Sequence, residues 1–146
     1  MEAQLFPSAP YILLVEDNPL VQLVTKSLLT EGGFQVDIAS NGAEALQLFA
    51  PEKYHLIYMD IGLPDMDGYT VTRAMRELEQ KAASASTPII ALTGHGAIDV
   101  QQFCGDAGMQ GVLSKPLSRD QAQKIWQRYG EPQAIEVPGL ILLKTF

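Results

Sequence analysis

The sequence predicts an α/β protein of the doubly wound class, in which a five-stranded parallel sheet carries helices on both faces. Short apolar runs alternate with helical patterns along the chain, as expected for consecutive β/α units. Three of the runs lead directly into polar or glycine-containing segments, which is typical of parallel strands whose carboxyl ends together form a site. A length of 146 residues suits a single domain that buries its core without disulfides or structural metal.

The first unit consists of a strand at residues 11–15 and a helix that follows it. Asn18 is suited to cap that helix and Pro19 to begin it, while the Gly32-Gly33 pair ends it. The apolar positions that recur at helical spacing are Val21, Val24 and Leu28.

The second and third units follow the same order. A half-buried strand at residues 36–39 precedes a short helix that stops before Pro51, and a buried strand at residues 56–59 ends in Asp60. A loop over residues 63–67 leads to the next helix. The apolar positions of the two helices are Ala45, Leu46 and Phe49 in the first, and Gly68, Val71, Met75 and Leu78 in the second.

The last two units complete the sheet. Residues 79–87 resemble a frayed helix end and a polar loop, residues 89–92 form the fourth strand and residues 111–113 the fifth. Gly105 and Gly108 interrupt the helical pattern between these two strands. Its apolar positions are Val100, Phe103 and Ala107, and those of the final helix are Ala122, Ile125, Trp126 and Tyr129.

The predicted domain covers residues 11–129. Residues 1–10 lack the basic and apolar regions of a secretory signal, so we expect a linker or the boundary of the expressed segment. Residues 130–146 form a tail in which proline and glycine break regular structure, although residues 140–143 are apolar. Packing on the domain, packing on a neighbouring molecule and connection to a further module all remain open for this tail.

Composition excludes several classes of function. Seventeen acidic residues against ten basic ones give a formal charge of -7, which disfavours direct binding to nucleic acid. The single cysteine, Cys104, has no intramolecular partner, and no apolar run approaches the roughly 18 residues of a membrane span. We therefore expect a cytoplasmic domain that makes no membrane contact itself.

Glu16, Asp17 and Asp60 each follow a predicted strand and should meet at one edge of the sheet. Two unit charges about 4 Å apart repel by roughly 4 kcal/mol at an effective dielectric near 20, so the cluster requires a cation. The ligands are hard oxygens, to which the backbone carbonyl of Gly62 could be added. This set favours Mg²⁺, with Mn²⁺ as a close substitute.

Lys115 and Thr93 are predicted to add a positive charge and a hydroxyl to the same place. An ammonium pairs well with a phosphoryl oxygen, and a hydroxyl can donate a hydrogen bond to the same group. The combination indicates a phosphoryl-accepting site in which Asp60 attacks phosphorus and becomes an aspartyl phosphate.

Four motifs together resemble the receiver domain of response regulators. They are LVEDN at residues 14–18, MDIGLP at 59–64 followed by Asp67-Gly68, ALTG at 91–94 and SKP at 114–116, each at a predicted strand end. The match covers about residues 11–129. It implies a flavodoxin-like sheet of order 2-1-3-4-5, Mg²⁺ bound directly by Asp17 and through water by Glu16, and phosphorylation of Asp60 by a phosphohistidine.

The resemblance also assigns roles to residues around the acceptor. Thr93 takes the switch position, whose hydroxyl moves to the new phosphoryl group, and Gly94 takes a position that is kept small to admit the donor. The Lys115-Pro116 bond is expected to be cis.

Two positions depart from the common pattern of the family. Glu16 stands where aspartate is commoner, which preserves the charge and lengthens the reach. Val112 stands where many receivers carry a tyrosine or phenylalanine that turns inward when the threonine moves. A smaller switch, or one transmitted by the backbone alone, is therefore expected here.

At the level of the whole protein, the resemblance is greatest to the receiver of a hybrid sensor histidine kinase, and a stand-alone regulator is the alternative. The expected partners are a histidine kinase or a histidine phosphotransfer domain, and a parent kinase of this type would be associated with the inner membrane. The domain itself takes part in phosphoryl transfer and autodephosphorylation without being a conventional enzyme.

Two further functions were weighed against this one. A Mg²⁺-dependent small-molecule phosphatase would need an acid two residues after the nucleophile, where this chain has Gly62. A receiver-like module that is never phosphorylated would fail to bind Mg²⁺. Among nearby polar residues, Asp67 is expected to cap a helix, Asp65 to have no ligand role, and His95 to be a surface residue.

Overall fold

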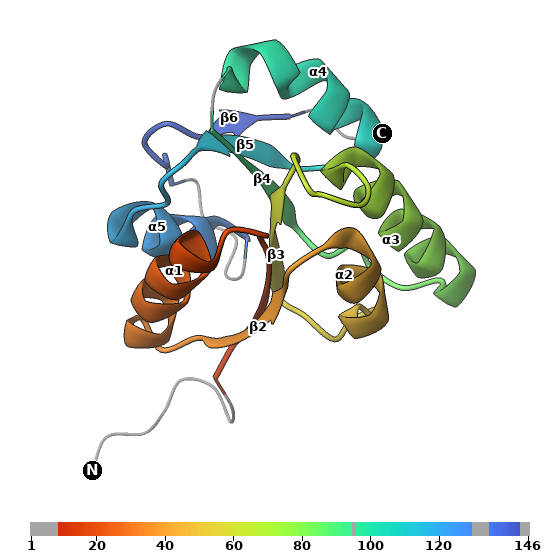
Figure 1. Cartoon of the computed structure of the whole chain (residues 1–146), viewed down its shortest axis with the longest axis horizontal. Coiled ribbons are helices and arrows are strands. Elements are labelled where there is room, and N and C mark those ends of the chain that lie inside the picture. The colour runs from red at the N-terminus through yellow and green to blue at the C-terminus, as the bar shows by residue number, and fades with distance from the viewer. Residues whose placement is uncertain (1–8, 95, 130–134, 144–146) are drawn as a thin grey trace.

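The computed structural model describes residues 9–94, 96–129 and 135–143, which form one sheet of order β2-β1-β3-β4-β5-β6 (Figure 1). The strands are β1 (Tyr11–Val15), β2 (Gln35–Ala39), β3 (Leu56–Asp60), β4 (Ile89–Thr93), β5 (Gly111–Ser114) and β6 (Ile141–Leu142). The first five are parallel and in the predicted order. The expected sheet of five strands must be corrected, however, because the tail adds β6 antiparallel to β5.

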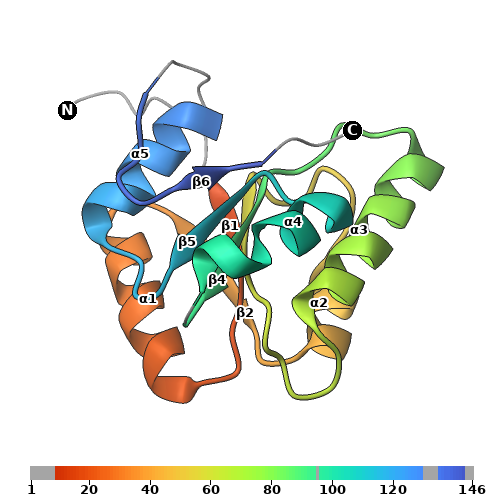
Figure 2. The same cartoon turned by 90° about the horizontal axis from the view of Figure 1, so that it is seen from above.

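Five helices cover the sheet, with α1 and α5 on one face and α2, α3 and α4 on the other (Figures 1 and 2). Their bounds are α1 (Pro19–Glu31), α2 (Gly42–Leu48), α3 (Gly68–Ala82), α4 (Ala97–Ala107) and α5 (Arg119–Tyr129). No helix among the described residues is both long and apolar enough to span a bilayer.

Side chains alternate between two apolar clusters on the two faces of the sheet. Ile12 and Leu14 of β1 pack with the α1 and α5 side, whereas Leu13 and Val15 pack with the α3 and α4 side. Every residue of β3 and β4 is buried, as in parallel strands covered on both faces. Burying one large aliphatic side chain contributes about 1.5–3 kcal/mol, so these central strands form a rigid base for the residues at their ends.

The predicted helix caps are confirmed where the chain leaves β1 and β3. Asn18 accepts hydrogen bonds from the N–H groups of Leu20 and Val21, and α1 begins at Pro19. Asp67 accepts a hydrogen bond of 2.8 Å from Thr70 and caps α3. Each cap therefore fixes the direction in which a helix leaves the same edge of the sheet.

Gly68, Val71 and Met75 of α3 and Ala107 of α4 are buried as predicted, but one expected inner position in each of three helices is wrong, because the residue after it is buried instead. Val24 is 52% exposed while Thr25 is buried, and Leu78 is 39% exposed while Glu79 is buried. In α4, Phe103 is 62% exposed and the neighbouring Cys104 is buried. The reason is that apolar residues occur on both sides of these helices, so spacing alone does not choose the face that meets the sheet.

The segment expected to fray after residue 79 is ordered. Helix α3 continues to Ala82, and Glu79 pairs with Arg76 at 2.7 Å. Glu79 also accepts a hydrogen bond of 2.7 Å from the N–H of Thr87. A buried carboxylate therefore ties the end of α3 to the residues that lead into β4.

Candidate functional site

Asp60 lies at the carboxyl end of the central strand β3, with only 6% of its surface exposed. Its Oδ1 accepts a hydrogen bond of 3.0 Å from the N–H of Gly62, two residues later. Because β1 and β4 flank β3, the ends of three strands surround this carboxylate. The prediction that strand endings converge on Asp60 is confirmed.

Glu16 and Asp17 follow β1 and differ sharply in exposure. Glu16 is 1% exposed, and its Oε2 accepts a hydrogen bond of 3.0 Å from Asn18, whereas Asp17 faces solvent. Burial raises the pKa of the Glu16 carboxyl, although Lys115 and the N–H of Asn18 partly offset this effect. One carboxylate of the pair is thus fixed by the fold and the other is accessible.

Glu16, Asp17 and Asp60 each present a carboxylate oxygen, and these three oxygens lie within 4.8 Å of one another. Around an octahedral Mg²⁺ ion with bonds of about 2.1 Å, neighbouring oxygens are about 3.0 Å apart and opposite ones about 4.2 Å apart. The cluster therefore suits the ion once the side chains move closer to it, or with one water between Glu16 and the metal. All three donors are hard oxygens, as Mg²⁺ prefers.

Lys115 follows β5 and places its ammonium between two of the acids. The Nζ atom is 2.7 Å from Glu16 Oε1 and 3.2 Å from Asp60 Oδ2. Burial alone would lower the pKa of Lys115, but Glu16 and Asp60 outweigh burial and raise it above its usual value. The lysine is therefore charged and lies against the carboxylate of Asp60.

Thr93 and Gly94 form the side of the site contributed by β4. Thr93 is buried, and its carbonyl accepts a hydrogen bond of 2.7 Å from the backbone N–H of Lys115. A β-carbon added to Gly94 would meet no atom within 4 Å, so there is open space above this residue. The Lys115-Pro116 peptide bond is cis, as expected. Residue 95 lies outside the described residues.

Some residues that shape the site carry no recognisable chemical motif. A β-carbon on Gly68 would lie 2.6 Å from the carbonyl oxygen of Asp60, so α3 begins in direct contact with the end of β3. Gln22 donates through Nε2 to the carbonyl of Glu16 at 2.6 Å and to Ser40 Oγ at 3.0 Å. The sequence analysis placed Gly68 in a motif and on the inner side of a helix, but it gave no indication of the contact with Asp60.

Asp65 takes a structural position beside the start of α2. Its carboxylate accepts hydrogen bonds from the N–H groups of Gly42 at 2.8 Å and Ala43 at 2.9 Å. These bonds lower the pKa of Asp65. The loop after β3 is thereby attached to the start of α2, which holds the loop beside Asp60.

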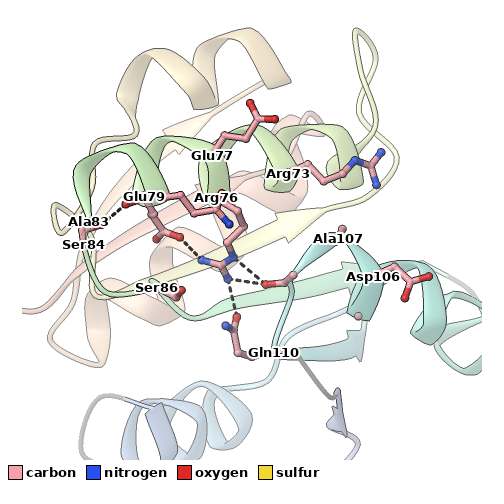
Figure 3. A pocket seen from close by; sticks show the side chains of 13 residues that line it. Arg73, Arg76, Glu77, Glu79, Ala83, Ser84, Ser86, Asp106, Ala107 and Gln110 are labelled. Atoms are coloured by element: carbon pink, nitrogen blue, oxygen red, sulfur yellow. Dashed lines mark hydrogen bonds and ion pairs between the residues drawn. The ribbon is translucent and has the colours of Figure 1, made fainter. Parts of the chain in front are cut away.

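A separate hollow of about 680 Å³ lies between α3 and α4, near the amino ends of β4 and β5 (Figure 3). Arg76 reaches across it and donates to the carbonyl of Gly108 at 2.9 and 2.7 Å and to Gln110 Oε1 at 3.0 Å. With the Glu79 ion pair, these bonds occupy most of the guanidinium donors. The hollow is a structural junction at the amino ends of the strands, opposite the carboxyl ends where Asp60 lies.

Comparison with known sequences gives a consistent result. The sequence pattern of the response regulator receiver domain matches residues 12–127. The chain is 38% identical over 124 residues to hybrid signal transduction histidine kinase L of Dictyostelium discoideum, covering 82% of this chain and 7% of that protein. It is 41% identical over 107 residues to the aerobic respiration control sensor protein ArcB of Escherichia coli, covering 73% of this chain and 13% of that protein.

Solved structures resemble the whole domain. One is the receiver domain of a sensor histidine kinase of Pseudomonas aeruginosa with a magnesium ion in its active site cleft. It has a TM-score of 0.73 and 38% identity, and the match covers 84% of this chain and 98% of that one. The second is the receiver domain of a Saccharomyces cerevisiae response regulator, crystallised with a histidine phosphotransfer protein. It has a TM-score of 0.78 and 27% identity, and the match covers 90% and 95% of the chains.

Proposed function

This chain belongs to the family of response regulator receiver domains, and from that premise we propose that Asp60 is the residue that accepts the phosphoryl group. The receiver acts in two-component phosphorelay signalling. The observation that carries the assignment is the position of Asp60, which lies at the end of β3 with Lys115 3.2 Å away and the two acids of β1 beside it.

In the proposed reaction an oxygen of Asp60 attacks the phosphorus of a phosphohistidine. The new bond joins Asp60 to phosphorus, the phosphorus–nitrogen bond breaks, and its electron pair leaves with the imidazole of the donor. Lys115 is already in place to pair with a phosphoryl oxygen, and Thr93 ends the adjacent strand. Gly94 leaves the space through which the donor would approach.

We propose that Glu16, Asp17, Asp60 and the Gly62 carbonyl hold Mg²⁺, with Mn²⁺ as a substitute. The ion would supply positive charge to the phosphoryl oxygens. Lys115 pairs with both the buried Glu16 and the nearby Asp60. Because Lys115 contacts both acids, metal binding would release the ammonium from Glu16 and leave it for the phosphoryl group.

The partner is proposed to dock on an exposed apolar patch of α1, formed by Leu20, Leu23 and Val24. These side chains are 68%, 65% and 52% exposed. Since α1 begins two residues after Asp17, the patch adjoins the site. A helical domain that presents a phosphohistidine could cover the patch and reach Asp60 in one binding mode. This chain's similarity to a receiver crystallised with a histidine phosphotransfer protein supports that partner class.

We further propose that the chain is the receiver segment of a hybrid sensor histidine kinase with a cytoplasmic receiver and an inner-membrane parent. The curated relatives are kinases, and this chain spans only 7% and 13% of the two described above. A stand-alone regulator is the alternative. Phosphotransfer profiling against purified kinases and phosphotransfer domains separates the two, because a hybrid receiver should exchange phosphoryl groups fastest with its own kinase or phosphotransfer domain.

Phosphorylation of the intact chain by a small-molecule phosphodonor and Mg²⁺ tests the assignment. Intact-protein mass should increase by one phosphoryl group in the wild type and stay unchanged in Asp60→Asn. Asp65→Asn is the matched control, because it makes the same change in a neighbouring carboxylate that contacts backbone N–H groups of α2. Equal labelling of Asp60→Asn and wild type would refute the assignment.

A further inference from the structure

Residues 135–143 cover the edge of the sheet next to β5. Ile141 pairs with Val112 and Leu142 with Gly111, so that β6 lies along β5 in both views of the molecule (Figures 1 and 2). Ile141 and Leu143 pack against the apolar cluster that contains Val112. Of the three alternatives left open for the tail, the structure shows packing on the domain for this segment.

A small number of bonds attach this segment to the domain. Gln121 donates through Nε2 to the carbonyl of Pro138 at 2.9 Å, and Arg128 donates through Nη1 to the carbonyl of Ile135 at 2.8 Å. The N–H of Leu143 donates to the carbonyl of Gln110 at 3.1 Å. Among the described residues, the segment is thus held by side chains of α5, by a strand pairing of two residues and by the packing of Val137, Leu140, Ile141 and Leu143 on the two apolar clusters.

The segment packs on the domain through its inner side and is bordered by open hollows on its outer side. Val137 is buried and Leu140 packs with it, whereas Leu142 is 53% exposed. The hollows, of about 620 Å³ and 310 Å³, lie beside α5 and α4. A strand that pairs over two residues at the side of the sheet opens more readily than the buried central strands, so opening of this segment need not unfold the domain.

Strand β5 connects this segment to the phosphoacceptor site. Lys115 directly follows β5, and its backbone N–H is bonded to the carbonyl of Thr93. Its ammonium lies 3.2 Å from Asp60. A phosphoryl group on Asp60 adds negative charge beside the ammonium group of Lys115 and therefore attracts this ammonium more strongly.

The order of the strands gives this attraction a direction. Asp60 lies on β3, beyond β4, whereas β6 lies on the opposite side of β5. Strand β6 pairs with Gly111 and Val112 in the first half of β5, so a movement of Lys115 towards β3 reaches this pairing through the residues between Val112 and Lys115. Strand β4 pairs with β5 over four residues and β6 over two, so the shorter pairing gives way first.

We propose that residues 135–143 form a regulatory latch on β5 that phosphorylation of Asp60 releases. This inference rests on the proposed function of Asp60. Coupling between two sites is reciprocal at equilibrium. If phosphorylation raises the equilibrium constant for opening the latch, the closed latch must lower the equilibrium constant for phosphorylation by the same factor. Weakening the latch should then raise the phosphorylated fraction at a fixed concentration of donor.

Hydrogen exchange in the full chain tests the release. With phosphorylation confirmed by intact mass, the amides of residues 140–143 should exchange about fivefold faster or more, the lower end of usual coupling between sites. Peptides from β1 serve as the internal reference. Unchanged exchange in a chain that carries the phosphoryl group overturns the latch alone, whereas a chain that never gains the phosphoryl mass overturns the latch and the proposed function together.

Gln121→Glu tests the reciprocal effect without disturbing α5. The variant keeps the side-chain oxygen that accepts from Ser118 at the start of α5, and it loses the amide donor to Pro138. Gln123→Glu makes the same chemical change at an exposed position of the same helix. We expect a higher phosphorylated fraction in Gln121→Glu and in Arg128→Gln, and the wild-type value in Gln123→Glu. Wild-type fractions in all three variants would contradict the latch.

Discussion

Replacing Gly68 by alanine should impair phosphorylation even though residue 68 makes no chemical contribution. The added β-carbon would lie 2.6 Å from the Asp60 carbonyl oxygen and 2.8 Å from the Ile61 Cα atom. Both are backbone atoms, so either α3 or the end of β3 must move. Overpacking costs about 1–3 kcal/mol, and alanine recovers up to about 1 kcal/mol of helix preference. The expected net loss of stability is therefore about 0–3 kcal/mol.

The functional effect should exceed this loss of stability, because a displacement of about 1 Å at a reacting group can reduce rates about a hundredfold. We expect phosphorylation of Gly68→Ala by a small phosphodonor to be about 10 to 100 times slower than in the wild type. Gly32→Ala is the control, because its β-carbon would approach no atom closer than 3.3 Å and Gly32 follows the end of α1, at the other end of this helix from the site. Urea denaturation and circular dichroism establish whether Gly68→Ala is folded. The reasoning fails if the folded variant is phosphorylated at the wild-type rate.

Three single substitutions and one set of substitutions on the surface of α1 should each change a different measured property. Lys115→Met should abolish phosphorylation but increase Mg²⁺ affinity, as measured by titration, because Glu16 loses its positive partner. Glu79→Gln should lower the free energy of unfolding by about 2–4 kcal/mol in urea, since it breaks a buried ion pair. The hydrogen bond from the N–H of Thr70 lowers the pKa of the Asp67 carboxyl. The contribution of this cap to the free energy of unfolding is therefore complete above pH 3.8, the ordinary pKa, and is lost as the pH falls through the lowered pKa. Asp67→Ala should lower the free energy of unfolding by about 1 kcal/mol at neutral pH and by little in acid. Serine substitutions across the α1 patch should slow transfer from a phosphohistidine domain about tenfold and leave labelling by a small phosphodonor unchanged.

The residues of the site were predictable because of a property of parallel sheets. Each strand brings its last residue to the same edge, so the positions of Glu16, Asp60 and Thr93 followed from the ends of three apolar runs. Lys115 was found in the same way after the fifth run. The supporting contacts were not predictable, since the close approach of Gly68 to β3 depends on the angle at which α3 packs.

The orientation of the helices shows a second limit. In α3, Glu79 is buried and Leu78 is 39% exposed, opposite to what hydrophobicity suggests. Glu79 is tolerated there because Arg76 neutralises it and the N–H of Thr87 satisfies its second oxygen. Arg76 lies three residues earlier on the same helix, but Thr87 lies beyond the end of α3 and is eight residues away in the sequence. A hydrophobicity pattern counts the glutamate as a surface residue, because it does not include the N–H of Thr87 that makes the burial of a carboxylate possible.

The tail shows why the missing aromatic at residue 112 could not be interpreted from the sequence. Val112 suggested a weaker switch because it replaces the aromatic side chain, and no sequence pattern places residues 140–143 beside it. In the structure, Ile141 pairs with Val112, and Ile141 and Leu143 pack on the same cluster. Apolar side chains from the tail therefore cover the strand on which the aromatic would lie. A domain with this arrangement can still report phosphorylation through β5, because the backbone of Lys115 links that strand to Thr93 and its ammonium links it to Asp60.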